Sequence, residues 1–244
     1  MNGTSHQFVT NLALACLDIR ERHILYPRWG GIESGSTLSD EFRVMWEPES
    51  LENKTKQLVH RYFVDSKNPK DHGGVTRAWD HASGSVSFIE DYIEDPNSYG
   101  TEVEFLENLG MYLGITSHHI ADLCTPVHVG HKMDYLRAKS KNRDGFHGRV
   151  ERDIARFAQK VPILFYKPKI VKLTKNFFKR IAADTYRAFF LRLEEMYAHS
   201  ATNEIQEMVS QVISQSVRHT ADVWHSILTA SGMLNRKWSM QPLI

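Results

Sequence analysis

The sequence is poor in cysteine, in long apolar runs and in net charge. Its 244 residues include two cysteines, Cys16 and Cys124, too few for a disulfide scaffold or a cysteine-rich zinc site, although one bridge between them stays open. No run of about 18 apolar residues occurs, so no transmembrane helix is predicted. The 30 Lys and Arg residues nearly balance the 29 Asp and Glu residues, which gives no electrostatic reason to expect binding to duplex nucleic acid.

The first residues lack the features of a secretion signal. MNGTSHQFVTNLALACLDI has no basic segment at its start, and Gln7, Thr10 and Asn11 interrupt its apolar part. We therefore expect either that the protein stays inside the cell or that this is the sequence of a mature form. Nothing in the sequence indicates an obligate protein partner.

Helical periodicity dominates the chain, and the period-two alternation typical of strands is absent. The apolar pattern predicts helices over 6–22, 50–64, 85–94, 101–124, 147–160, 169–199 and 202–230. Glycine and proline predict loops over the Gly/Ser-rich residues 26–41 and over 68–84, and Pro126 should end the helix before it. With no repeat, linker or break in composition, the sequence predicts a single all-α domain over residues 1–244.

Histidine is the one residue type in excess, because 13 histidines are about twice the usual number. HHIADLCTPVH, residues 118–128, contains His118 and Asp122 four residues apart, so an imidazole and a carboxylate share one helix face, as zinc ligation requires. His128 follows Pro126 and can turn toward a different point nearby. His147 and Glu151 form a second pair of this spacing. One such pair is usually a surface or capping pair, but two pairs around a Pro-x-His favour a metal site.

Three upstream stretches complete a pattern that is similar to a known family. The central residues read His118-His119-Ile120-Ala121-Asp122, then Pro126-Val127-His128, then His147-Gly148-Arg149-Val150-Glu151. Upstream lie SHQFVTNLALACLDI with His6, GSTLSD ending at Asp40, and HRYFVD beginning at His60. Together they resemble the bacterial zinc-dependent phospholipases C, whose helical fold is shared by the fungal single-strand-specific zinc nucleases. His119 stands where the family usually has a tyrosine that is not a ligand.

The resemblance implies a site for up to three zinc ions. One ion would be held by Asp40, His60, His118 and Asp122, a second by Met1 (through its backbone amine and carbonyl), His6 and the other oxygen of Asp122, and a third by His128, His147 and Glu151. Asp122 would therefore bridge two ions. Asp40 would be the catalytic residue, orienting the attacking water or accepting its proton.

The implied activity is zinc-dependent phosphodiester hydrolysis, most like a phospholipase C that cleaves the glycerol-side phosphate ester of phospholipids. Glu151 favours the phospholipases, because the nucleases generally have aspartate at this position. Glu41 and Gln57 lie where known phospholipases form an aromatic choline pocket, so the headgroup stays open. Two alternatives remain: a single-strand nuclease or 3′-nucleotidase of the same fold, and a non-catalytic zinc-binding protein.

A basic stretch lies outside this pattern. KPKIVKLTKNFFKR, residues 167–180, interleaves six Lys and Arg residues with apolar ones. Most of this stretch falls in the helix predicted over 169–199. It has two interpretations: a solvated helix face, or a basic amphipathic helix that makes transient contact with an anionic membrane surface. The expected partners are thus a phospholipid or other phosphodiester and a membrane surface.

Overall fold

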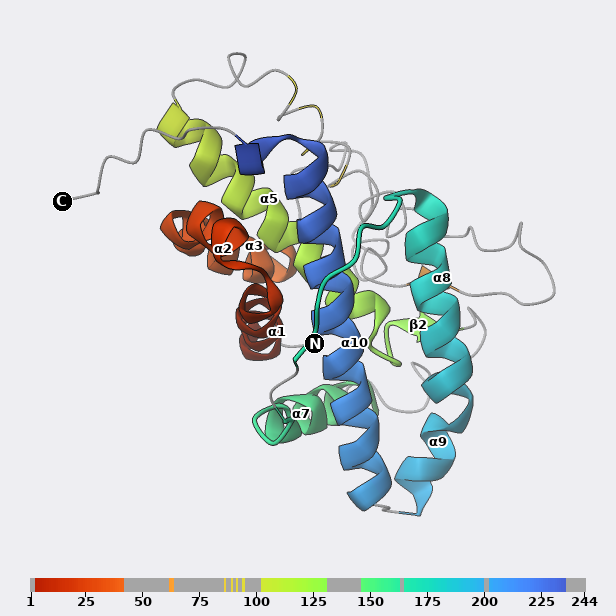
Figure 1. Ribbon diagram of the computed structural model, residues 1–244. Coiled ribbons are helices and arrows are strands. Elements are labelled where there is room, and N and C mark those ends of the chain that lie inside the picture. The colour runs from red at the N-terminus through yellow and green to blue at the C-terminus, as the bar shows by residue number, and fades with distance from the viewer. Residues whose placement is uncertain are drawn as a thin grey trace, which may run out of the picture.

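The computed structural model describes residues 3–41, 62–63, 86, 89, 91, 94, 102–130, 146–162, 165–199 and 202–235 (Figure 1). Most of these residues are helical, which confirms the all-α prediction. The α-helices are α1 (Gly3–Cys16), α2 (Ile19–Leu25), α3 (Trp29–Glu41), α5 (Glu102–Leu123), α7 (Phe146–Ala158), α8 (Lys175–Thr185), α9 (Leu191–Ala198) and α10 (Thr202–Ala230). The shorter elements are the 3₁₀ turns Tyr26–Arg28 and Met233–Asn235, the π-helical turn Tyr186–Phe190, and the strands β1 (Tyr62–Phe63) and β2 (Val129–Gly130).

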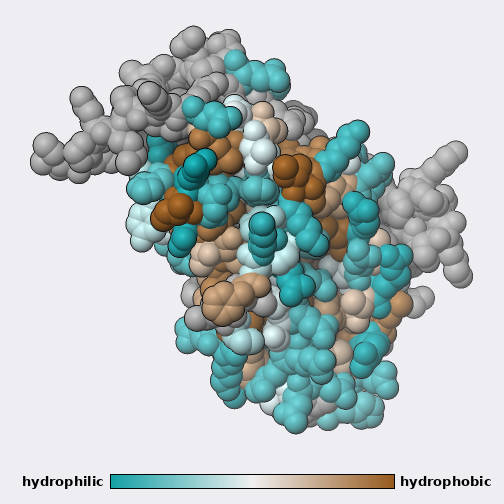
Figure 2. Space-filling model, viewed as in Figure 1, coloured by the Kyte–Doolittle hydropathy of each residue, from teal (hydrophilic) through white to brown (hydrophobic). Residues whose placement is uncertain are grey.

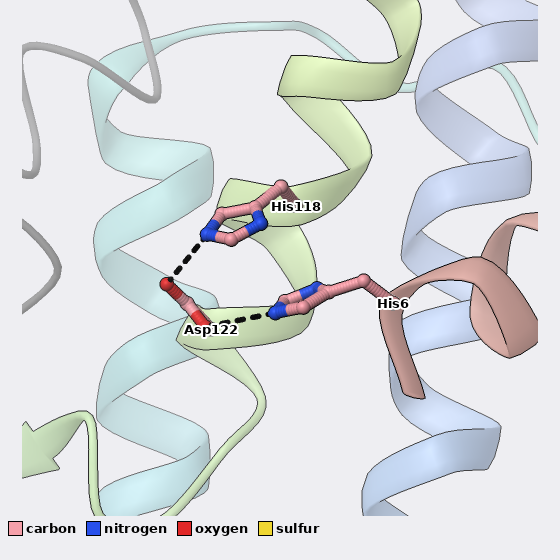
Figure 3. A group of neighbouring side chains, drawn as sticks. All are labelled: His6, His118 and Asp122. Atoms are coloured by element: carbon pink, nitrogen blue, oxygen red, sulfur yellow. Dashed lines mark ion pairs between the residues drawn. The ribbon is translucent and has the colours of Figure 1, made fainter. Parts of the chain in front are cut away.

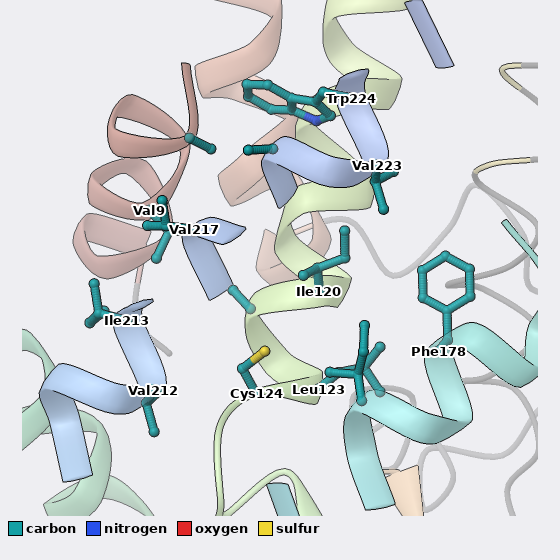
Figure 4. Close-up of a cluster of buried hydrophobic side chains, with 14 of the residues drawn as sticks. Val9, Ile120, Leu123, Cys124, Phe178, Val212, Ile213, Val217, Val223 and Trp224 are labelled. Atoms are coloured by element: carbon teal, nitrogen blue, oxygen red, sulfur yellow. The ribbon is translucent and has the colours of Figure 1, made fainter. Parts of the chain in front are cut away.

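Helix α10 runs along the middle of the described structure, and α1, α5, α7 and α9 contact it (Figure 1). Its apolar residues recur every three or four positions, so one side of the helix is buried along its whole length. Val212, Ile213 and Val217 of α10 lie in the same hydrophobic core as Val9 of α1 and Ile120 of α5 (Figure 4). The core thereby joins α1, which carries the predicted ligand His6, to α5, which carries His118 and Asp122.

Trp224 anchors α10 to α5. Its side chain is fully buried, and the indole Nε1–H donates to the carbonyl oxygen of Leu113 at 3.2 Å. A buried indole is stable only when its N–H has an acceptor, so this bond accompanies the apolar packing of the ring (Figure 4).

The helices predicted over 101–124, 147–160 and 202–230 are confirmed by α5, α7 and α10, and α5 ends at Leu123, ahead of Pro126. The single helix predicted over 6–22 is instead two helices. The break occurs at Asp18, whose side chain accepts from the backbone N–H groups of Arg20 and Glu21, while the Glu21 side chain accepts from the Asp18 N–H. This reciprocal capping box starts α2 as a separate helix.

The loop predicted over 26–41 is wrong, because these residues form a 3₁₀ turn and α3. Glycine has low helix propensity, but here its missing side chain lets α3 pack closely on α5. A Cβ atom on Gly35 would collide with the carbonyl oxygen of Met111, and one on Gly114 would collide with that of Ile32. We call this contact, made by Gly35, Gly110 and Gly114, the glycine seam.

The helix predicted over 169–199 is wrong at its start and interrupted in its middle. Residues 165–173 are extended, α8 begins after the N-cap Thr174, and the π-helical turn separates α8 from α9. The backbone N–H groups of Lys169 and Val171 donate to side chains of α10, Asp222 at 2.7 Å and Ser226 at 2.9 Å. These bonds replace the helical hydrogen bonds that the apolar pattern suggested.

Residues 62 and 63 are a strand, although the sequence predicts a helix over 50–64. Tyr62 pairs with Val129 and Phe63 with Gly130 in a parallel register. The rest of that helix and the loop over 68–84 lie outside the described residues, whereas residues 86, 89, 91 and 94 are helical, as predicted for 85–94. Among the described helices, none is both long and apolar enough to cross a membrane.

Candidate metal centre

Three helices and one turn bring five predicted ligands into a single cluster. His6 comes from α1, His118 and Asp122 from α5, His128 from the turn after α5, and Glu151 from α7. The first four are buried, and Glu151 is partly exposed. His6 and His118 both point at the carboxylate of Asp122 (Figure 3).

His118 is held in one tautomer by a backbone carbonyl. Its Nδ1 lies 2.9 Å from the carbonyl oxygen of Ser36 in α3, which can only accept, so Nδ1 carries the proton and donates it. In a neutral ring, Nε2 then presents a lone pair toward Asp122 Oδ2, 3.3 Å away. A metal cation bound between these two atoms would satisfy both of them. Metal-binding histidines are oriented in this way, with one nitrogen on the metal and the other on a carbonyl or carboxylate.

His6 supplies a second nitrogen, which faces the other oxygen of the Asp122 carboxylate. Its ring stacks on that of His118, with centroids 3.9 Å apart and planes 16° from parallel, and its Nε2 lies 3.6 Å from Asp122 Oδ1. Burial, and then the neighbouring His118, hold the pKa of His6 well below its usual value. His6 is therefore neutral at pH 7, the form in which imidazole binds a metal.

The spacing of these atoms suits a metal ion. The ligand atoms of His6, His118 and Asp122 all lie within 4.8 Å of one another. Two ligands bound about 2.0–2.1 Å from one tetrahedral zinc are roughly 3.4 Å apart. The two nitrogen–oxygen distances, 3.3 and 3.6 Å, bracket that value. Two imidazoles and a carboxylate are also the donors that zinc accepts, so the residues fit the metal that the sequence implies.

The carboxylate of Asp122 contacts all three histidines of the cluster. Burial alone would raise the pKa of its carboxyl group, but His128 and His118 outweigh this and hold the pKa well below its usual value. The carboxylate is therefore ionised, with Oδ2 toward His118 and Oδ1 toward His6 and His128. Its two oxygens face different imidazoles, an arrangement compatible with a bridging role.

The break at Pro126 suggested that His128 turns toward a point away from Asp122, but the structure places the two side chains in contact. Its Nδ1 lies 3.2 Å from Asp122 Oδ1, and its Nε2 lies 3.1 Å from Glu151 Oε1. Within the described residues, the two expected groups of ligands thus form one continuous cluster through the His128 ring. The cause is a tight turn, in which the Thr125 N–H donates to the Asp122 carbonyl and the His128 N–H to the Thr125 carbonyl.

The other predicted ligands are only partly described. Met1 and His60 lie outside the described residues, and of Asp40 and His147 the backbone alone is described, in the last turn of α3 and the first turn of α7. Asp40 follows Ser36 by four residues and His147 precedes Glu151 by four, so Asp40 shares a helix face with Ser36, and His147 shares one with Glu151. The pairing of β1 with β2 also brings residue 62 beside residue 129, the neighbour of His128.

His119 is buried beside this cluster, with its ring edge-on to His118 at 5.8 Å, and it is not among the three residues whose ligand atoms converge. No disulfide joins Cys16 and Cys124. Burial raises the pKa of Cys124 to about 12, so its thiol is protonated at neutral pH and is a poor metal ligand.

The Ser36 carbonyl is the component that reading the sequence missed. It is a backbone atom in a segment predicted as loop, 82 residues from His118, so no side-chain motif marks it. One signal was present: Gly110 and Gly114 are four residues apart on α5 and therefore lie on one helix face. Small residues at that spacing indicate a close helix partner.

The lowered pKa of His6 predicts a pH-dependent stability of the metal-free protein. Below about pH 6.5 the unfolded chain takes up a proton at His6, whereas the folded chain keeps this histidine neutral. The stability that depends on neutral His6 is therefore fully present above that pH and is lost as the pH falls toward the folded pKa. We expect His6→Asn to reduce the slope of unfolding free energy against pH by up to about 1.4 kcal/mol per pH unit between pH 6.5 and 5. Urea unfolding with a chelator present measures this slope; an unchanged slope would contradict the assignment.

Comparison of the sequence with known protein families and with curated proteins finds no match. The function is therefore inferred from the residues of the cluster and the motif that contains them.

Proposed function

We propose that this protein is a zinc-dependent phosphodiesterase, related in fold and chemistry to the zinc-dependent phospholipases C. The observation that carries the proposal is the orientation of His118. Its Nδ1–H is taken by the Ser36 carbonyl, and its Nε2 faces an ionised carboxylate beside the neutral, stacked His6. A buried group of this kind is costly for folding unless it binds a cation.

Each described residue has a definite role in this proposal. His6, His118 and Asp122 would hold zinc, and His128 with Glu151 would extend the site toward α7. Zinc held there would act as a Lewis acid on a phosphoryl oxygen and would make water more acidic. The Ser36 carbonyl keeps His118 in the tautomer that leaves Nε2 available. Burial of the four inner residues excludes bulk water and strengthens the electrostatic attraction between these residues and a cation.

Asp40 and Glu151 support the choice of reaction and substrate in this proposal. Asp40 lies on α3, one turn beyond Ser36, and we assign it to orient the attacking water or accept its proton. Glu151 is within 3.1 Å of His128, where the phospholipases have glutamate and the related nucleases generally have aspartate. We therefore favour a phospholipid substrate, cleaved at the glycerol side of its phosphate.

A parallel hydrolysis assay tests the proposal. The purified chain would be incubated with phosphatidylcholine, phosphatidylserine, single-stranded DNA and a chromogenic phosphodiester, with and without a chelator, and bound zinc would be counted by elemental analysis. We expect chelator-sensitive release of phosphorylated headgroups and at least one zinc per chain. Hydrolysis of DNA alone would identify a nuclease of the same fold, and bound zinc without turnover would identify a non-catalytic zinc protein.

A further inference from the structure

An extended segment crosses the surface of α10 between α7 and α8 in the chain. Residues 165–173, here called the strap, run over α10 and lead into α8 (Figure 1). Three donors of the strap bond to α10: the Tyr166 hydroxyl and the Lys169 N–H donate to Asp222, and the Val171 N–H donates to Ser226. Since its backbone is bonded to a buried helix face, the strap presents its outward side chains in a fixed arrangement.

The strap has an inner and an outer side. Tyr166, Val171 and Leu173 pack against the hydrophobic core. On the outer side, Phe165 is 101% exposed and Ile170 is 68% exposed, two of the few large apolar side chains that the described structure leaves in solvent. Lys167, Lys169 and Lys172 are exposed between and beside them. The outer side therefore combines protruding apolar groups with lysines.

The charge of this region differs sharply from that of the whole chain. Residues 154–183 contain eight Lys and Arg residues and no Asp or Glu, whereas the whole chain has a net charge of +1. The carboxylate that meets the strap, Asp222, is buried and accepts bonds from Tyr166 and Lys169. The exposed lysines of the strap are thus not neutralised by an acidic residue in their own stretch of sequence.

We infer that the strap is a docking surface for anionic lipid membranes. Lysines near an anionic bilayer each contribute to binding, and their alkyl chains allow the charge to stay at headgroup level while apolar neighbours go deeper. Phe165 and Ile170 are suited to that deeper position, below the level of the lysines. On the face in Figure 2, brown hydrophobic patches lie among teal hydrophilic side chains where the strap crosses α10.

A lipid surface explains these side chains better than single-stranded nucleic acid does. Nucleic-acid binding without sequence preference depends on aromatic rings that stack on bases. The strap exposes one such ring, on Phe165, while the branched aliphatic side chain of Ile170 has no planar face to stack. Insertion into a bilayer uses both residues. The view that docking brings the enzyme to its substrate rests on the proposed function, but binding to the membrane does not.

Vesicle co-sedimentation tests the charged part of the surface. The full chain would be mixed, with a chelator present to prevent turnover, with vesicles of phosphatidylcholine containing 0 or 40 mol% phosphatidylserine. We expect binding to the anionic vesicles only, weakened by salt. The triple variant Lys167→Gln, Lys169→Gln, Lys172→Gln should bind on the order of 100-fold more weakly, because each lysine contributes about fivefold. The matched control, Arg20→Gln, Arg187→Gln, Arg192→Gln, removes three exposed charges from α2, the π-helical turn and α9; it should keep most of the binding.

A second pair of variants tests the apolar part. Ile170→Ser should weaken binding about tenfold, because it removes an apolar side chain that enters the bilayer. Leu191→Ser, on α9, removes a side chain of nearly equal exposure, 64%, and should have little effect. Absence of binding to the anionic vesicles, equal losses in the strap and control variants, or binding of single-stranded DNA in place of vesicles would each overturn the inference.

Vesicle binding and substrate hydrolysis are measured separately, so the two proposals can fail independently. If the vesicles bind but neither lipid nor chromogenic phosphodiester is hydrolysed, the proposed function fails and the docking surface stands. If the chromogenic substrate is hydrolysed but anionic vesicles do not bind, the docking surface fails and the metal-dependent activity stands.

Discussion

Under the proposed function, Asp122→Asn is expected to lose bound zinc and phosphodiester hydrolysis together. The carboxylate faces all three histidines of the cluster, with Oδ2 toward His118 and Oδ1 toward His6 and His128. Asparagine has the same shape, but it replaces one anionic oxygen with an N–H donor and removes the charge that attracts the metal. Since stabilisation by a bound metal is worth several kcal/mol, kcat/KM should fall on the order of 1,000-fold. Elemental analysis and the chromogenic assay measure the two losses.

The control for this variant is Asp184→Asn, which makes the same chemical change at an exposed carboxylate paired with Arg187. It should keep full zinc content and activity. Circular dichroism establishes whether Asp122→Asn retains its helices; if it does not fold, His6→Asn removes a different ligand and should still lower zinc content. Wild-type zinc content in folded Asp122→Asn would show that Asp122 does not bind the metal.

Gly35→Ala is expected to destabilise the protein by about 3 kcal/mol or more, because the added methyl group forces α3 and α5 apart. The Cβ atom would collide with the carbonyl oxygen of Met111, a backbone atom inside α5 that cannot rotate away. Separation of the helices also moves the Ser36 carbonyl away from His118. We therefore expect a lower zinc affinity as well as a lower urea midpoint.

Gly30→Ala provides the matched control on the same helix. A Cβ atom there meets nothing within 4 Å, so alanine should stabilise α3 by about 0.5–1 kcal/mol through its higher helix propensity. Opposite signs for the two variants would identify close packing as the reason for Gly35. If Gly35→Ala were as stable as the wild type, the glycine seam would not determine the position of α3.

The two glycine-containing segments show where reading the sequence succeeds and fails. In α5 the apolar pattern is strong enough to predict a helix despite Gly110 and Gly114, and the prediction over 101–124 is confirmed. In residues 26–41 the apolar pattern is weaker, and the glycines led to a predicted loop. Packing against α5 supplies the stability that local propensity lacks there. The strap shows the reverse, since a helical pattern was overridden by bonds from its backbone to Asp222 and Ser226.

By itself, the sequence determined the helical class, the extents of α5, α7 and α10, and the placing of His118 and Asp122 on one face. These features depend on residues three or four positions apart, and such contacts are encoded locally. The tertiary structure alone decided that the Ser36 carbonyl orients His118 and that His128 spans Asp122 and Glu151. It also decided that the five Lys and Arg residues of 169–180, predicted to lie on one helix, are divided between the extended strap and α8. Each of these depends on which surfaces of distant segments pack together, and that choice is made by the core as a whole.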